Sequence, residues 1–275
     1  MQGGGYIELT YLQVAAAALL ILVNGGISVA LKLGLERRLF VAALRTVVQL
    51  LLVGLVLQWV FSLSRWYLVV ALGLVMALVA GATAVRRTER RYPGIWANAV
   101  LSVWLSSWTI AAAALFGIVD VEPWYRPQYA IPLLGMILGN TLNGISLGLD
   151  RLGEDLATRR GEVEGLLALG ATRWEAARAP VRRSVRTGMV PIVNAMMVAG
   201  IVSLPGMMTG QLLAGVDPVE AVKYQVVIMF LLASGTALGT VGVVLLSYRR
   251  LFNRRHQFLQ HTLRRVGRRG RRVRG

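Results

Sequence analysis

The stretch EVEGLLALGATRWEAARAPVRRSVRTG, residues Glu162–Gly188, is a charged interruption in a chain otherwise rich in long apolar runs. Leu166, Leu169 and Trp174 recur at helical spacing, and Gly170 suits the left-handed conformation that ends a helix. Thr172 followed by Glu175 is the pattern of a capping box, which starts a helix. The stretch therefore predicts a helix, a tight turn and a second helix.

The runs around it predict an all-α polytopic membrane protein. The chain has 275 residues, of which 56% are hydrophobic, and its mean hydropathy is +0.60. Seven runs are long enough to cross a hydrocarbon layer of roughly 30 Å as helices. The predicted spans are Leu9–Leu31, Leu39–Phe61, Trp66–Val85, Ile95–Val119, Tyr129–Leu149, Met189–Leu213 and Tyr224–Ser247.

Basic residues predict the orientation of these spans. Of the 30 lysines and arginines, 26 lie in connections after odd-numbered spans and in the tail, and three lie on the opposite side. Basic residues accumulate on the cytoplasmic side of a membrane. We therefore expect a protein of the inner membrane with its N-terminus outside and its C-terminus in the cytoplasm. The net charge of +17 is thus a topology signal, and nucleic acid is not an expected partner.

Several function classes fit poorly. The chain has no cysteine, and no predicted span contains Asp, Glu or His. This disfavours an ATP-independent secondary transporter, which needs a coupling site at membrane depth, and a membrane-embedded enzyme. A seven-helix receptor matches the topology, but this chain has no mid-span lysine to bind retinal and no sizeable predicted outer domain to bind a ligand. No G-x-x-x-x-G-K-[ST] phosphate loop occurs, so ATP-driven transport would need a separate ATPase.

Polar residues within the spans are candidates for a translocation path. Arg45 is the single charge inside a span, and Gln49 lies one turn away on the same face. Snorkelling of Arg45 to the interface is the alternative. Two glycine-rich stretches of the form G-M-x-x-G-[N/Q]-x-L-x-G, which also fit close helix packing, add further amides. The candidates are Arg45, Gln49, Asn140, Asn143, Asn194 and Gln211. Methionines of the sixth span are expected as apolar filling, so no metal site and no bound cofactor are predicted.

The run Glu164–Thr172 resembles the cytoplasmic coupling loop of ABC transporter permeases, in which a Glu precedes Gly-Ala by six positions. Arg183 stands where the importer pattern has a proline, so the match is partial. The pattern also fits an amphipathic helix pair lying on the membrane or on the protein's own helices. The resemblance implies docking on a cytoplasmic ATPase through Glu164, Leu169, Gly170, Ala171, Thr172, Arg173, Trp174 and Glu175.

Nearly the whole chain resembles the Fet-type (FetB-type) iron-export ABC transporter permeases, to which plant aluminium-tolerance permeases are related. The stretches that carry the resemblance are RTVVQL, PLLGMILGNTLNGISLGLDRL and ALGATRWEAARAPVRRSVRTGMVPIVNAMMVAGIVSLPGMMTGQLLAG, at residues 45–50, 132–152 and 168–215. The resemblance implies a homodimer that exports iron or another metal. ATP and magnesium would bind the partner ATPase, so this chain would be no enzyme by itself.

The predicted domain organisation follows. Residues 1–248 form a transmembrane permease domain with a coupling loop at 150–187, and residues 249–275 form a basic cytoplasmic tail. We expect the tail to be a basic helix against anionic lipid headgroups, with disorder as the alternative.

Overall fold

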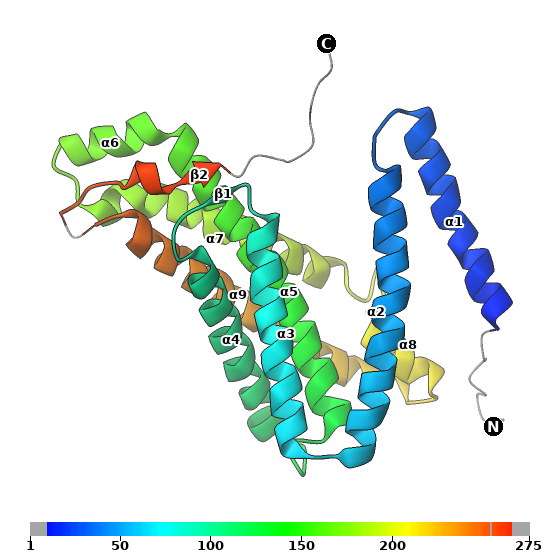
Figure 1. Cartoon of the computed structure of the whole chain (residues 1–275). Coiled ribbons are helices and arrows are strands. Elements are labelled where there is room, and N and C mark those ends of the chain that lie inside the picture. The colour runs from blue at the N-terminus through cyan, green and yellow to red at the C-terminus, as the bar shows by residue number, and fades with distance from the viewer. Residues whose placement is uncertain (1–9, 254, 266–275) are drawn as a thin grey trace.

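The computed structural model describes residues 10–253 and 255–265, and these are predominantly helical (Figure 1). The all-α membrane architecture expected from the sequence is confirmed. The helices are α1 (Tyr11–Ala30), α2 (Glu36–Leu63), α3 (Trp66–Arg87), α4 (Ile95–Ala113), α5 (Pro127–Thr158), α6 (Arg160–Ala168), α7 (Arg173–Val198), α8 (Gly206–Leu213) and α9 (Pro218–Leu251). A π-helical turn, Ala114–Ile118, extends α4.

Six helices of the described chain are long and apolar enough to cross a membrane: α1, α2, α3, α4 with its π-helical extension, α5 and α9. The sixth predicted span, Met189–Leu213, was wrong as a single helix. Its residues form the end of α7, a break and the short helix α8. Gly200 adopts a φ of +82°, which L-residues rarely reach, and Pro205 favours an extended conformation at the residue before it. These two residues divide the span.

The predicted loop 150–187 is mostly helical. α5 continues past the predicted span end to Thr158, and α6 and the first half of α7 supply most of the rest. The helices of the membrane region therefore run directly into the charged segment. A displacement of that segment would act on α5 and α7 without an intervening flexible linker.

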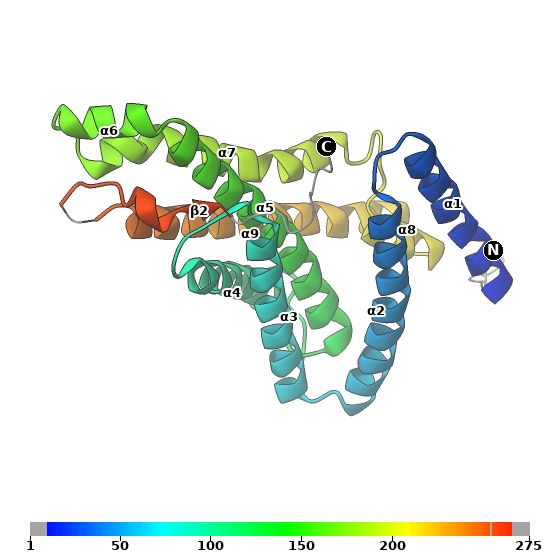
Figure 2. The same cartoon turned by 45° about the horizontal axis from the view of Figure 1, so that its top comes forward.

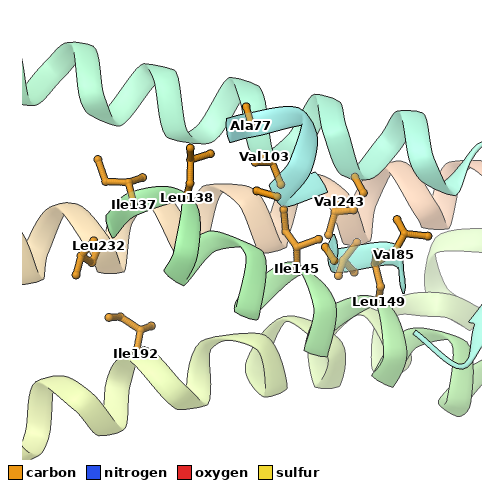
Figure 3. Packing of buried hydrophobic residues seen from close by; sticks show 14 of the residues in the cluster. Ala77, Val85, Val103, Ile137, Leu138, Ile145, Leu149, Ile192, Leu232 and Val243 are labelled. Atoms are coloured by element: carbon orange, nitrogen blue, oxygen red, sulfur yellow. The ribbon is translucent and has the colours of Figure 1, made fainter. Parts of the chain in front are cut away.

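α5 lies at the centre of the bundle and packs most extensively against α9 and α7, then against α3 and α4 (Figure 1). Its buried side chains Ile145 and Leu149 meet Val243 of α9 and Val85 of α3 in one apolar cluster (Figure 3). α1 and α2 form a hairpin that stands beside this bundle, and α2 touches α5 only slightly (Figure 2).

Three helices cross closely at Gly144 of α5. A Cβ at this position would lie 2.5 Å from Thr240 Oγ1 and 3.2 Å from the carbonyl oxygen of Gly188. Small residues thus let α5, α7 and α9 meet nearly backbone to backbone. Close packing by the four-apart glycines of the repeated motif was wrong at Gly139, Gly206 and Gly210, where a Cβ would meet nothing within 4 Å.

The segment after α9 is not the expected helix in its described part. It contains a 3-10 turn, Gln260–Thr262, and a two-residue strand β2 (Arg264–Arg265), which pairs antiparallel with β1 (Arg90–Arg91). The helical tail prediction is therefore wrong for residues 252–253 and 255–265. In this segment, strand pairing with β1 and contacts between aromatic rings determine the conformation in place of the helical spacing of apolar residues. Arg254 and residues 266–275 lie outside the described chain.

Candidate functional site

The turn between α6 and α7, residues 169–172, is capped from both sides, and we call it the coupling turn. Gly170 has a φ of +91°. The amide of Ala171 donates to the carbonyl of Leu166 and the amide of Gly170 donates to that of Leu167. This is the hydrogen-bond pattern of a Schellman motif, which satisfies the last carbonyls of α6.

The other side of the turn is a complete capping box. The Thr172 amide and hydroxyl donate to Glu175 Oε2 at 2.7 and 2.8 Å, and the Glu175 amide donates back to Thr172 Oγ1. Hydrogen bonds from the Thr172 amide, then from its hydroxyl, lower the pKa of Glu175. The contribution of the ionised Glu175 carboxylate to stability is therefore fully present above the usual carboxyl pKa, and it is lost as the pH falls through the lowered pKa.

Large apolar side chains project from this turn and from the start of α7. Leu169 is 87% exposed and Trp174 is 43% exposed. Glu164, on the preceding helix, accepts a hydrogen bond from Arg160 Nε at 2.8 Å. An exposed leucine and an exposed tryptophan on a turn with fixed backbone geometry are features of a protein-binding surface.

The segment after α9 contacts the first residue of α7, next to the coupling turn. The Arg173 amide donates to His256 Nδ1 at 2.8 Å, and Arg173 Nη1 donates to the carbonyl of Asn253. The Trp174 ring lies edge-on to Tyr248, with ring centroids 5.4 Å apart. Tyr248 continues through Phe252 into Phe258 as an aromatic column. The first turn of α7 is thereby joined to the end of α9.

A buried carboxylate joins the end of α5 to the first half of α7. Asp155 Oδ2 accepts from Arg183 Nε at 2.6 Å, and Asp155 Oδ1 lies 3.1 Å from Arg151 Nη2. The Asp155 side chain is 3% exposed, so its charge depends on these two arginines. Sequence reasoning did not find Asp155 or the contacts of the tail, because neither has a local motif. The single signal was Arg183 in place of the importer proline.

The predicted path residues lie on four helices. Arg45 and Gln49 are exposed on α2, and Gln49, with its amide oriented to accept, lies 3.1 Å from Arg45 Nε. Asn194 is exposed on α7. Gln211 of α8 has a buried Oε1 with no hydrogen-bond partner in the described chain.

The two remaining amides of the path set are on α5. Asn140 donates to the carbonyl of Met136 in its own helix, and Asn143 accepts from Arg87 Nη1 of α3 at 2.8 Å. Within the described residues, the structure gives no hydrogen bond between members of the path set on different helices. Arg45 and Gln49 are the members of the set that lie within hydrogen-bond distance of each other in the described chain.

A cavity of about 340 Å³ lies beside the break between α7 and α8. Met196, Met208 and Met229 line it, together with Gln225, whose Oε1 accepts from the Met208 amide at 3.3 Å. Its other lining residues are mainly apolar. No group of three or more His, Asp or Glu side chains that could hold a metal ion occurs in the described residues.

Comparison with known proteins places the chain in a family. A model described as an uncharacterised protein family (UPF0014) matches residues 11–252. A UPF0014 membrane protein of Synechocystis is 41% identical over 82% of this chain and 88% of its own length. The probable iron export permease protein FetB of Escherichia coli is 32% identical over 92% of this chain and 96% of its own.

Plant proteins also match. The protein named ALUMINUM SENSITIVE 3 of Arabidopsis thaliana is 29% identical over 90% of this chain and 89% of its own length. No solved structure matches. Since the family model covers all nine α-helices of the described chain, the protein belongs to the UPF0014 family of multi-pass membrane proteins.

Proposed function

We propose that this chain is the membrane-spanning permease subunit of an ABC transporter and that a separate ATPase subunit docks on the coupling turn. The observation that carries the proposal is a doubly capped turn that presents Leu169 and Trp174 to solvent. The chain contains no phosphate loop. ATP, magnesium and hydrolysis would therefore belong to the partner, and this subunit would supply the path.

Rigid connections support a mechanical role for the turn. Asp155 ties α7 to α5, and the aromatic column from Trp174 to Phe258 ties α7 to the end of α9. Closure of two ATPase subunits would displace the turn, and these contacts would carry the displacement into the bundle. The helices would thereby switch between inward and outward access.

The proposed assembly is a homodimer in the inner membrane, with the N-terminus outside and the C-terminus in the cytoplasm. Arg45, Gln49 and Asn194 are exposed in apolar segments. Polar groups at membrane depth are costly against lipid and are normally covered by protein or water. A second copy facing these residues would enclose an aqueous path lined by them and by Asn140, Asn143 and Gln211.

The proposed substrate is iron or another metal ion, moved outward. The support is the resemblance together with the name of the Escherichia coli relative, a probable iron export permease. A comparison of the metal content of cells with and without the protein tests this part. An unchanged content of every metal under metal excess would overturn it.

The docking proposal is tested by co-purification with the ATPase. Leu169→Asp places a charge at the most exposed apolar side chain of the turn, and Trp174→Ala removes the aromatic anchor. We expect each to reduce the co-purified ATPase by at least about tenfold, since central anchors contribute roughly 2 kcal/mol or more.

Thr158→Asp is the matched control, because it adds the same charge at an exposed residue at the end of α5. This variant should retain the ATPase. Equal recovery of the ATPase with Leu169→Asp and with the unmodified chain would refute docking through the turn. Uphill transport by the reconstituted chain alone, without nucleotide hydrolysis, would refute the permease assignment.

A further inference from the structure

The C-terminal segment returns to the connection between α3 and α4 and pairs with it there (Figure 1). In the register of the two strands, Arg90 is opposite Arg265 and Arg91 is opposite Arg264. Four arginines thus form two directly opposed pairs, which we call the arginine ladder. This ladder is separate from the coupling turn and does not belong to the proposed docking surface.

Like charges directly opposite each other destabilise an antiparallel pair. Arg265 lies 3.6 Å from a Glu89 carboxylate oxygen, and the Arg91 guanidinium lies over the Trp96 ring at 5.8 Å. Within residues 10–253 and 255–265, no carboxylate forms an ion pair with Arg90, Arg91 or Arg264. The pairing of the strands therefore leaves a local excess of positive charge.

The ladder lies where a membrane surface would be. β1 follows the last residues of α3 and precedes α4, and both helices are candidate membrane spans. Arg250, at the end of a third candidate span, approaches the same connection: its guanidinium lies 3.9 Å from the Cβ position of Gly94. Arginines next to Trp96 at the ends of spans are typical of the headgroup region.

We propose that the arginine ladder binds the phosphate groups of anionic phospholipids and that these headgroups supply the counter-charge for the pairing of β1 with β2. A guanidinium binds phosphate oxygens through two parallel hydrogen bonds. The headgroup is favoured over a phosphate free in solution because the ladder directly joins the ends of membrane-spanning helices.

Headgroup binding would also order the tail. The same segment carries Asn253 and His256, which contact Arg173, and Phe258, which ends the aromatic column. Release of β2 from β1 would free the far end of this segment. The lipid composition of the cytoplasmic leaflet would therefore determine how firmly the segment supports the first turn of α7.

Hydrogen–deuterium exchange of the full chain in nanodiscs tests this inference. The exchange rates of residues 88–92 and 258–265 are compared in pure phosphatidylcholine and in phosphatidylcholine mixed with phosphatidylglycerol. We expect exchange of both segments to slow by about tenfold in the anionic discs, from attraction of the ladder to the charged surface. The double variant Arg264→Gln/Arg265→Gln should lose this difference.

A control variant, Arg37→Gln/Arg38→Gln, removes two exposed arginines at the start of α2. It should keep the lipid-dependent protection. Equal exchange of the unmodified chain in the two kinds of disc would overturn the inference. So would equal loss of protection in the control variant, which would indicate non-specific surface attraction. The same protection by millimolar inorganic phosphate in phosphatidylcholine discs would assign the ladder to a free anion and overturn the lipid proposal.

Discussion

At the scale of single residues, the coupling turn depends on a few side chains with defined partners. Gly170 supplies the left-handed backbone, Thr172 and Glu175 satisfy the free amides of α7, and Arg173 contacts the C-terminal segment. With the backbone held in this way, Leu169 and Trp174 remain exposed to solvent. The capping residues were readable from sequence because a cap is a local pattern of four residues.

Asp155 is the residue whose removal should most disturb the base of this region. Asp155→Ala leaves Arg151 and Arg183 without their shared carboxylate, at a cost of about 1–3 kcal/mol in the free energy of unfolding, since both arginines remain partly solvated. Thermal unfolding of the purified protein in detergent measures the change.

The neighbouring Glu154 is a matched control for this prediction. Its side chain is 60% exposed and lies 4.0 Å from Arg151 Nη1. Glu154→Ala should change the free energy of unfolding by less than about 0.5 kcal/mol. Equal destabilisation by the two substitutions would show that burial of Asp155 has no special consequence.

At the scale of elements, the apolar helices were predictable and their interruptions were less so. Length and apolar composition located α1 to α5 and α9 to within several residues of one or both ends. The division of the sixth span depends on Gly200, whose positive φ is one of several conformations that a glycine can adopt. The pairing of the tail with β1 depends on contacts between residues more than 170 positions apart. The spacing of apolar residues along the sequence does not predict such contacts.

The crossing of α5, α7 and α9 allows a direct test of helix packing. Gly144→Ala would place a Cβ 2.5 Å from Thr240 Oγ1 and 2.6 Å from Thr236 Cγ2. We expect it to lower the free energy of unfolding by roughly 1–3 kcal/mol through overpacking. Gly139→Ala, five residues earlier in the same helix, meets nothing within 4 Å.

Gly139→Ala should therefore be neutral or stabilising, because alanine favours a helix by about 1 kcal/mol over glycine. Both variants are compared by chemical unfolding in the same detergent. If the two substitutions had the same effect, the close approach at Gly144 would not limit the packing of the three helices.

At the scale of the whole molecule, one chain leaves its α1–α2 hairpin largely exposed beside the bundle (Figure 2). An arginine facing lipid costs roughly 2.5–3.5 kcal/mol on insertion scales. The exposed face of α2 that carries Arg45 and Gln49 is therefore the surface at which we expect a second copy. The sequence indicated the polar pair but not its exposure, which depends on how α2 packs against the rest of the chain.

Cysteine cross-linking tests this arrangement without background, because the chain contains no cysteine. Leu52→Cys lies on the face of α2 that carries Arg45, and Leu105→Cys is similarly exposed on α4. A short bis-maleimide should join two copies through position 52 and not through position 105. The two yields are read from dimer bands on denaturing gels, and equal yields would contradict a dimer face on α2.

Because α9 is long, a small tilt of this helix at one end produces a large displacement of its other end. Its 34 residues make a rod of about 51 Å at 1.5 Å per residue. After Pro218 it has no proline that would bend it. Tilting such a lever by about 5° about one end would swing the other end by roughly 4 Å, which is more than the diameter of a water molecule. A small displacement at Trp174, transmitted through Tyr248, would thus become a shift of roughly 4 Å at the opposite end of α9.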